Sequence, residues 1–208
     1  FGASGQSCIA GSRLYLENEI YDEFIEKISS KAKKIIIGHP MEEKTQMGPL
    51  CTLSQLNNIE EKVKKTLESG GALITGGEKP KEINQGWYYK PTIIACEHHN
   101  LPVAESELFG PVLSVMKFSG ENEVIKLMND NEYGLAAGIF TENIGTAIRV
   151  SKAVKAGIVF INTYRLISPT APFGGFKNSG FGRESGMETI RDYSRIKTTW
   201  INTSKEIM

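Results

Sequence analysis

Cys8 is the residue of this sequence with the clearest potential for chemistry. It follows the run Gly-Gln-Ser and precedes Ile-Ala-Gly, so its thiol lies among small residues where a substrate carbon can approach it. A thiol becomes a strong nucleophile when a neighbouring base, a cation or a helix N-terminus raises its thiolate fraction. A buried structural cysteine is the alternative interpretation of a single thiol in this context. The spacing of the surrounding residues favours the nucleophile.

The histidines offer no second chemistry of comparable strength. A thiol hydrolase would need a histidine beside Cys8, and none of His39, His98 and His99 has a recognisable catalytic context. His98 and His99 follow Cys96, but adjacent side chains of an extended chain point to opposite faces, and no further ligands follow at metal-binding spacing. We therefore expect no metal site, and we place His98 and His99 in a solvated loop.

The segment around Cys8 resembles the active-site signature Phe-x-x-x-Gly-Gln-x-Cys-x-Ala of the NAD(P)-dependent aldehyde dehydrogenase superfamily. Phe1, Gly5, Gln6, Cys8 and Ala10 stand in the matching places. Four further segments are similar to motifs of this superfamily and follow in the same order, at residues 107–112, 131–136, 157–162 and 172–180. Because the five segments span nearly the whole chain, it resembles the catalytic half of such an enzyme.

The resemblance assigns the cofactor contacts to Glu107 and Phe109. In the family, the matching glutamate hydrogen-bonds the hydroxyls of the nicotinamide ribose, and the matching phenylalanine packs near the nicotinamide. A carboxylate suits this role because it accepts two hydrogen bonds from vicinal hydroxyls. The implied cofactor is NAD or NADP, since the residue that distinguishes them lies upstream of the cysteine motif.

The resemblance also implies four residues on the substrate side. Asn162 ends an expected strand, and the matching asparagine of the family supports the geometry of the cysteine region. Phe173 matches a residue that packs against the bound aldehyde. Arg165 and Ile167 lie in the entrance loop, residues 163–171, where several relatives carry acidic or aromatic residues. An arginine there would attract a substrate carboxylate; a solvated arginine at the rim is the alternative.

The composition indicates a small molecule or another protein as partner. The 208 residues include 24 Lys+Arg and 24 Asp+Glu, a balance that predicts binding to neither nucleic acid nor an anionic membrane. Cys8, Cys51 and Cys96 fit neither a disulfide framework nor a zinc knuckle, which indicates a reducing compartment. No apolar run approaches the roughly 20 residues of a membrane span. We expect a soluble, cytoplasmic protein.

Hydrophobic periodicity predicts an α/β fold, a three-layer domain whose mostly parallel twisted sheet is flanked by helices. Helical spacing predicts helices over residues 19–34, 53–70, 123–128 and 147–154. Short apolar or alternating segments predict strands at residues 12–16, 72–75, 87–94, 112–118, 135–140 and 158–162. The strand at 72–75 is expected to be buried.

We divide the chain into an aldehyde dehydrogenase catalytic domain, residues 1–190, and a C-terminal oligomerisation strand and tail, residues 191–208. Residues 193–202 alternate polar and apolar side chains and resemble the final strand of the family, which pairs with a neighbouring subunit. We therefore expect a homo-oligomer, a dimer or tetramer, of the full-length protein. Because the chain begins at the cysteine signature, we expect a longer polypeptide whose N-terminal cofactor-binding domain is absent from this chain.

The resemblance implies oxidation of an aldehyde to a carboxylic acid with NAD(P)+. The Cys8 thiolate would add to the aldehyde carbon, the Cys8 N–H would stabilise the oxyanion of the thiohemiacetal, and a general base would activate water to hydrolyse the later thioester. The family's general base lies upstream of the cysteine motif, so we expect no turnover by this chain alone. A CoA-acylating relative and an inactive assembly domain stay open as alternatives. The aldehyde itself is not identified.

Overall fold

The computed structural model describes residues 1–204. Its largest sheet has four strands in the order β1-β4-β3-β2, in which β4 runs parallel to β1 and β3 while β2 pairs antiparallel at the edge. The strands are β1 (Arg13–Glu17), β2 (Ala72–Thr75), β3 (Thr92–Ala95) and β4 (Val112–Phe118). The expected α/β fold with a mostly parallel sheet is confirmed.

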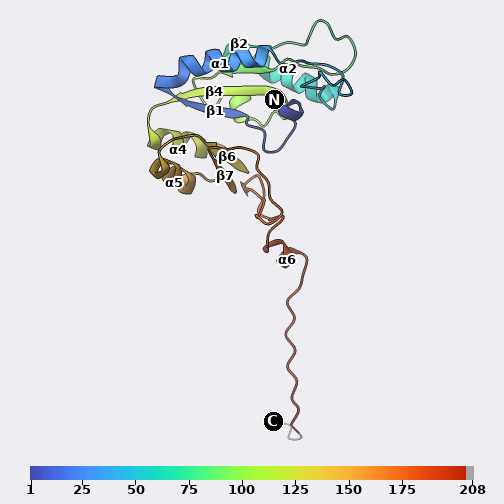
Figure 1. The fold of residues 1–208 in the computed structure, drawn as a ribbon, viewed down its shortest axis with the longest axis vertical. Helices are drawn as coiled ribbons and strands as arrows, with labels where there is room; N and C mark the ends of the chain where they lie inside the picture. The colour runs from blue at the N-terminus through green and yellow to red at the C-terminus, as the bar shows by residue number, and fades with distance from the viewer. Residues whose placement is uncertain (205–208) are drawn as a thin grey trace.

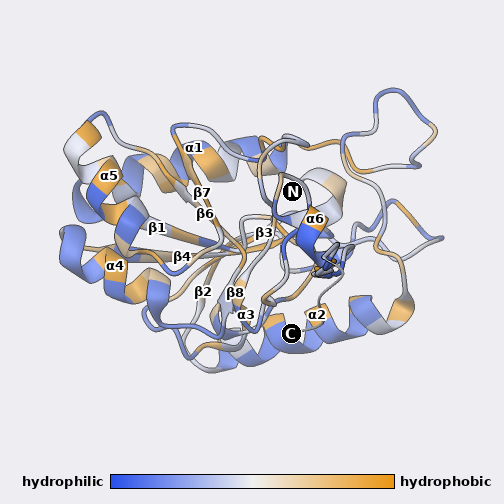
Figure 2. Ribbon diagram, turned by 90° about the horizontal axis from the view of Figure 1, so that it is seen from below, coloured by the Kyte–Doolittle hydropathy of each residue, from blue (hydrophilic) through white to orange (hydrophobic). Residues whose placement is uncertain are grey.

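Helices α1 (Tyr21–Lys33) and α2 (Leu53–Glu68) cover opposite faces of this sheet, as Figure 2 shows. The alternation of side chains along each strand supplies both faces with apolar groups. Ile93 packs into the core beneath α1, whereas its neighbour Ile94 packs into the core beneath α2, and both side chains are fully buried. The helix–sheet–helix arrangement gives the three layers that the periodicity predicts.

Helix α2 is joined to the short helix α3 (Pro102–Glu105) through one buried hydroxyl. Thr66 near the end of α2 donates to the Lys62 carbonyl at 2.8 Å and accepts from the Val103 N–H at 3.1 Å. The Thr66 side chain is fully buried, so the second bond satisfies an N–H at the start of α3 that water cannot reach. This joint fixes the start of the segment that leads to Glu107.

A second group of strands and helices follows β4 in sequence and lies below the large sheet in Figure 1. Its elements are α4 (Glu121–Asn129), β5 (Tyr133–Gly134), β6 (Ala136–Ile139), α5 (Ile144–Ala153), β7 (Ile158–Ile161) and β8 (Phe176–Lys177), with β5 and β8 antiparallel. Strands β6 and β7 pair in parallel, and α4 and α5 pack on them around Ala137, Ile139, Val150 and Val154.

The C-terminal segment leaves the body of the molecule after the short helix α6 (Thr189–Asp192) and runs away from it in Figure 1. Residues 193–204 contain no strand, and the predicted strand at 193–202 is therefore not formed within this chain. A strand requires a neighbouring backbone to bond with, and none lies beside this segment in the described part of the chain. Pairing with another subunit stays a prediction, and residues 205–208 of the predicted tail lie outside the described residues.

Two local expectations are wrong because the burial of each segment depends on where it lies in the folded chain. Strand β2 forms at the predicted residues, but Ala72 and Leu73 are exposed because β2 is an edge strand. His98 is exposed as expected, whereas His99 is half-buried and stacks on Tyr15 of β1 with ring centroids 5.5 Å apart. The buried Nε2 of His99 has no hydrogen-bond partner, and burial lowers the pKa of the ring.

Candidate active site

Cys8 lies on an exposed turn between the short 3-10 helix at Gly2–Gly5 and strand β1. The Ala10 N–H donates to the Ser7 carbonyl at 2.9 Å and closes the turn, while the buried Ile9 side chain anchors it. The Cys8 N–H makes no hydrogen bond within residues 1–204. The turn therefore presents the thiol and a free backbone donor from the same residue.

The cysteine loop, residues 1–11, packs backbone against backbone on the loop that carries Glu107. Gly5 has φ +72°, and a Cβ at this position would lie 2.0 Å from the Gly110 carbonyl oxygen. Only glycine permits both the conformation and this approach. The two loops are therefore in direct main-chain contact.

The cysteine loop is also bonded to residues 48–51, the loop before α2. The Ser4 hydroxyl donates to the Gly48 carbonyl at 2.8 Å. The Gln6 carboxamide donates to the Pro49 carbonyl at 3.4 Å and accepts from the Cys51 N–H at 2.9 Å. Side chains on both sides of Gly5 thus hold the turn from which the thiol projects.

Glu107 and Phe109 are both exposed in the neighbouring loop, and the Phe109 side chain is 41% accessible. Glu107 forms no hydrogen bond or ion pair within the described part of the chain. Phe109 adopts φ +51°, and Gln55 of α2 supports this conformation by donating to the Leu108 carbonyl and, at 3.1 Å, to the Phe109 carbonyl. The loop therefore offers a free carboxylate and an accessible ring from a supported backbone.

Asn162 stands directly after β7 in the left-handed region, with φ +52°. Its side-chain oxygen accepts from the Thr141 N–H and its side-chain nitrogen donates to the Thr141 carbonyl, both at 2.9 Å. These bonds join the end of β7 to the residues after β6. Asn162 supports the local backbone, and its contact with substrate stays a prediction.

Arg165 lines a cavity of about 390 Å³ together with Tyr164 and, from the cysteine loop, Gly5 and Ala10. The structure therefore brings Arg165 and the cysteine loop to one cavity. Ile167 is exposed two residues further on and does not line this cavity.

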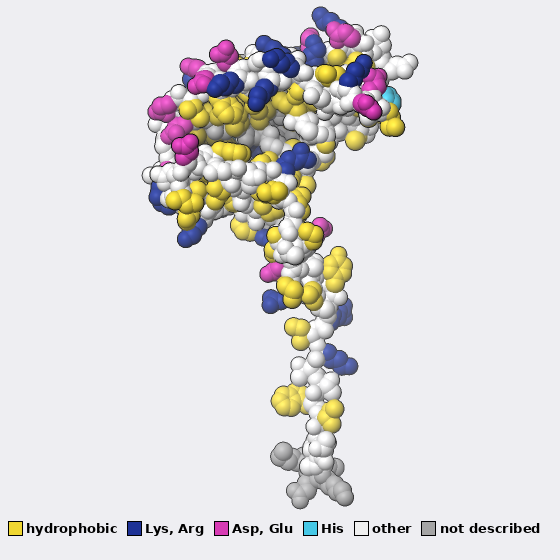
Figure 3. All heavy atoms as spheres, viewed as in Figure 1, with side chains coloured by type: hydrophobic (Ala, Val, Ile, Leu, Met, Phe, Trp, Pro, Cys, Tyr) yellow, Lys and Arg dark blue, Asp and Glu magenta, His cyan; other side chains and the backbone are white. Residues whose placement is uncertain are grey.

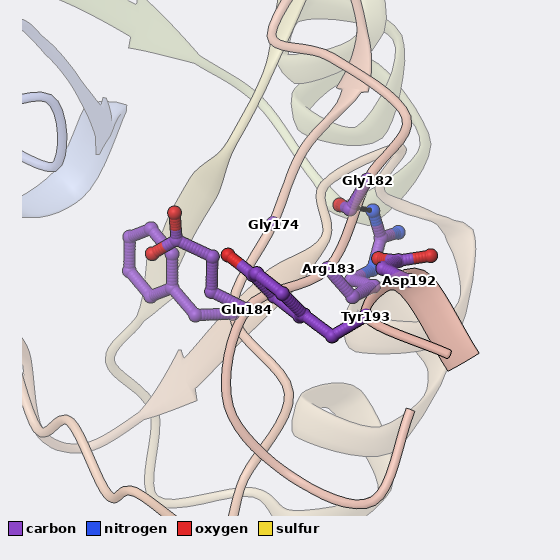
Figure 4. Close-up of a pocket in the computed structure, with 7 residues that line it drawn as sticks. Gly174, Gly182, Arg183, Glu184, Asp192 and Tyr193 are labelled. Atoms are coloured by element: carbon purple, nitrogen blue, oxygen red, sulfur yellow. Dashed lines mark hydrogen bonds between the residues drawn. The ribbon is translucent and has the colours of Figure 1, made fainter. Parts of the chain in front are cut away.

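Phe173 lies in a different cavity of about 500 Å³. Its N–H donates to the Glu184 carbonyl at 2.7 Å and its carbonyl accepts from the Glu184 N–H at 2.8 Å. In Figure 4 the ring of Tyr193 stands between Glu184 on one side and Arg183 with Asp192 on the other. Because no cysteine-loop residue lines this cavity, the predicted contact of Phe173 with the aldehyde gains no support from this chain alone.

The comparison with known proteins decides the family, since the family model described as aldehyde dehydrogenase family matches residues 1–199. The chain belongs to the aldehyde dehydrogenase family. It is 45% identical to the (Z)-2-((N-methylformamido)methylene)-5-hydroxybutyrolactone dehydrogenase of Acinetobacter baylyi and 41% identical to the betaine aldehyde dehydrogenase of Brucella melitensis. Each match covers 99% of this chain and 42% of the relative.

Solved structures of aldehyde dehydrogenases share the fold. The betaine aldehyde dehydrogenase of Staphylococcus aureus in complex with NAD+ matches 92% of this chain and 38% of its own with TM-score 0.89 and 37% identity. The NAD+ complex of the Bacillus cereus aldehyde dehydrogenase matches 97% of this chain and 40% of its own with TM-score 0.93 and 36% identity. The chain thus spans about two fifths of the length of these relatives.

The three cysteines of this aldehyde dehydrogenase chain lie in different environments. Cys8 and Cys51 are exposed, whereas Cys96 is buried and donates weakly to the Ile94 carbonyl. Burial raises the pKa of the Cys96 thiol to about 11, which keeps it protonated near neutral pH. Among the three thiols of the folded chain, only those of Cys8 and Cys51 are therefore exposed to an electrophile in solvent.

Gln55 supports the backbone of the Glu107 loop, a role that no sequence motif indicates. Its position three residues after Thr52 matches the first turn of a capped helix, and the Thr52 hydroxyl accepts from the Gln55 N–H at 3.1 Å. The sequence could have shown a helix start but not the target of the Gln55 side chain.

Within residues 1–204, no group of His, Cys, Asp and Glu could hold a metal ion, and no helix could cross a membrane.

Proposed function

We propose that this chain is the thiol-bearing part of an NAD(P)-dependent aldehyde dehydrogenase that oxidises an aldehyde to a carboxylic acid. One observation carries the proposal. The exposed Cys8, with its free N–H, lies in a loop whose backbone contacts the backbone of the Glu107 loop through Gly5 and Gly110. A nucleophile and a candidate cofactor loop are thereby fixed relative to one another.

The residues of the second loop fit the nicotinamide end of the cofactor. Glu107 is an exposed carboxylate without a partner in the described part of the chain, and it can accept two hydrogen bonds from vicinal ribose hydroxyls. Phe109 offers an accessible ring two residues further on, against which a flat heterocycle can pack. When bound, NAD or NADP supplies the acceptor for the hydride of the aldehyde.

Cys8 performs the covalent chemistry in this proposal. Its thiolate adds to the aldehyde carbon and gives a tetrahedral thiohemiacetal, whose oxyanion accepts a hydrogen bond from the Cys8 N–H. Loss of the hydride leaves the acyl group on the sulfur as a thioester, and water releases the acid and regenerates the thiol. We assign the base that activates this water to no residue of this chain, and we expect no turnover by the chain alone.

The assembly and the compartment are further parts of the proposal. The exposed apolar side chains of the C-terminal segment, among them Ile196 and Trp200, support a homo-oligomer of the full-length protein. The three free cysteines support a reducing compartment, and we place the protein in the cytoplasm. No observation on the described residues favours the CoA-acylating alternative.

The test uses the full-length enzyme and follows the absorbance of the reduced nicotinamide. Cys8→Ser should lower kcat by about 10⁴-fold or more because the hydroxyl is a far weaker nucleophile. Cys51→Ser, which removes the other exposed thiol, should change kcat by no more than about twofold. Site-resolved alkylation should modify Cys8 and leave Cys96 unmodified until the protein unfolds. Turnover retained by Cys8→Ser would sink the proposal.

A further inference from the structure

The cavity beside Arg165 connects the two halves of the fold. It is bounded by α1 and β4 of the large sheet on one side and by Tyr164 and Arg165, after β7, on the other. Figure 3 shows a hollow between these two layers, with hydrophobic side chains along its walls and a Lys or Arg side chain at one end. Gly5 and Ala10 line the cavity from either side of Cys8 in sequence. A ligand held here would touch the loop that carries the thiol.

The walls of this cavity are mostly apolar, but they include the polar residues Ser12 and Tyr164 and two cationic side chains. Ile28 and Ile35 line it from α1 and from the residue stretch after α1, and Leu113 lines it from β4. Lys31 and Arg165 also line it, and neither forms an ion pair within residues 1–204. No aspartate or glutamate stands among the lining residues. The cavity therefore combines an apolar wall with uncompensated positive charge, which attracts an anion.

Gly2 makes the room in which the Arg165 side chain lies. A Cβ on residue 2 would lie 2.9 Å from Nη1 of Arg165, so the guanidinium sits directly over the Gly2 backbone. Gly2 also lines the cavity, six residues before Cys8. Nη1 of Arg165 therefore lies beside the cysteine loop, although the residue as a whole is exposed.

We propose that this cavity binds a carboxylate carried on a short apolar chain, with Arg165 as the residue that binds the anion. A guanidinium donates two parallel hydrogen bonds to a carboxylate, a geometry that the ammonium of Lys31 cannot provide. Lys31 adds attraction at longer range, and the apolar wall accommodates the chain. A cationic aldehyde would meet two like charges and is disfavoured.

Two sources can supply this carboxylate. It can belong to the aldehyde itself, an ω-oxo carboxylate, and this form rests on the proposed dehydrogenase function. It can also belong to a separate aliphatic acid, and this form requires no catalysis. The two sources share the same chemistry and are separated by the two measurements below.

The first measurement is kcat/KM of the full-length enzyme for 5-oxopentanoate and for pentanal, two aldehydes of equal length that differ in the carboxylate. The ratio compared is kcat/KM for 5-oxopentanoate divided by kcat/KM for pentanal. Arg165→Gln should lower this ratio by about 10- to 100-fold, the loss expected for a charge-assisted contact. Arg165→Lys should recover part of the ratio. Lys33→Gln, which removes a charge from the same helix as Lys31 but does not line the cavity, should leave the ratio unchanged.

The second measurement is calorimetric binding of pentanoate to the same full-length protein without aldehyde. Binding should weaken as salt is raised and should fall by about tenfold or more in Arg165→Gln. Gly2→Val, which displaces the guanidinium without removing it, should have a similar effect.

The outcomes separate the sources and the two proposals. A lower ratio identifies the substrate as the source, and a loss of pentanoate binding with an unchanged ratio identifies a separate acid. If Arg165→Gln changes neither, the inference is overturned. If the unmodified enzyme oxidises neither aldehyde, the form of the inference in which the aldehyde carries the carboxylate is overturned, while the pentanoate measurement still decides the cavity and Cys8→Ser still decides the dehydrogenase proposal.

Discussion

The cysteine loop and the C-terminal segment are held in opposite ways. The cysteine loop is fixed by main-chain contact at Gly5 and by the side chains of Ser4 and Gln6, all within this chain. The C-terminal segment leaves Ile196 98% and Trp200 92% accessible, and it pairs with no strand in the described part of the chain. The position of the thiol is therefore set by contacts within this chain, whereas nothing within residues 1–204 covers the apolar side chains of Ile196 and Trp200.

The largest expected effect comes from breaking the contact between the two loops. Gly5→Ala places a Cβ 2.0 Å from the Gly110 carbonyl oxygen at φ +72°, and no side-chain rotation relieves this overlap. We expect the free energy of unfolding of the chain to fall by at least about 3 kcal/mol, measured by chemical denaturation.

Gly180→Ala is the matched control for that substitution. Gly180 has φ +103°, but a Cβ added there would meet no atom within 4 Å, so only the backbone strain of about 1 to 2 kcal/mol applies. Equal losses for the two variants would show that the loop contact contributes nothing beyond strain.

A smaller effect is expected at the joint between α2 and α3. Thr66→Val leaves the buried Val103 N–H without an acceptor and should lower the free energy of unfolding by about 2 kcal/mol. Amide hydrogen exchange at Val103 should accelerate accordingly. Thr66→Ser keeps the hydroxyl and should lose about 1 kcal/mol, the value of one buried methyl group. A larger loss for serine than for valine would contradict this role of the hydroxyl.

His99 provides a pH-dependent test of the same region. Burial lowers its pKa in the folded chain below the ordinary 6.5, so as the pH falls through about 6.5 the unfolded chain takes up the proton first. Stability should therefore decrease as the pH falls toward the folded-state pKa. His99→Phe keeps a ring against Tyr15, removes the unpartnered Nε2 and should raise the free energy of unfolding by about 1 kcal/mol.

The pH titration of stability distinguishes His99 from its neighbour. In His99→Phe the decrease in stability below pH 6.5 should become shallower. His98→Gln changes an exposed histidine and should leave the decrease as it is in the unmodified chain. An unchanged titration in His99→Phe would exclude His99 as its origin.

The smallest effect on stability is expected in the C-terminal segment. Ile196→Ser combined with Trp200→Ser should change the free energy of unfolding of the chain by less than about 0.5 kcal/mol, because both side chains are already exposed. The same double variant of the full-length protein should lower the oligomer mass in sedimentation experiments. Lys197→Ser is the polar control from the same segment. An oligomer unaffected by the double variant would remove this segment from the interface.

Local sequence patterns were sufficient to predict the helices and strands whose own hydrophobic periodicity is regular. The strand at residues 112–118 is observed at the predicted residues, and the ends of α1 and α2 differ from prediction by no more than two residues. The alternation at 193–202 failed to predict a strand in this chain, because a strand also requires a partner backbone. The burial expected for Ala72 and Leu73 failed because their place at the sheet edge depends on the order of all four strands.

The candidate site also contains residues that short motifs predict and contacts that only the folded chain reveals. Cys8, Glu107 and Phe109 follow from short motifs, and the structure places their two loops in contact. The supporting contacts of Gln55 and Gln6, with partners more than forty residues away in the chain, could not be read from any local pattern. The cavity beside Arg165 depends on four separate segments, at residues 1–12, 28–35, 110–113 and 164–165, and likewise emerges only from the folded chain.

The contact between Gly5 and Gly110 has a consequence for engineering specificity. Since main-chain atoms meet there, the closest contact between the thiol loop and the Glu107 loop involves no side chain of either loop, while Ser4 and Gln6 hold the thiol loop from elsewhere. Residues such as Phe109 or Arg165 can then be exchanged to change what is bound, while the backbone that sets the position of the nucleophile remains in place. A library of variants built on this chain would sample new substrates at a constant attack geometry, provided that both glycines are kept.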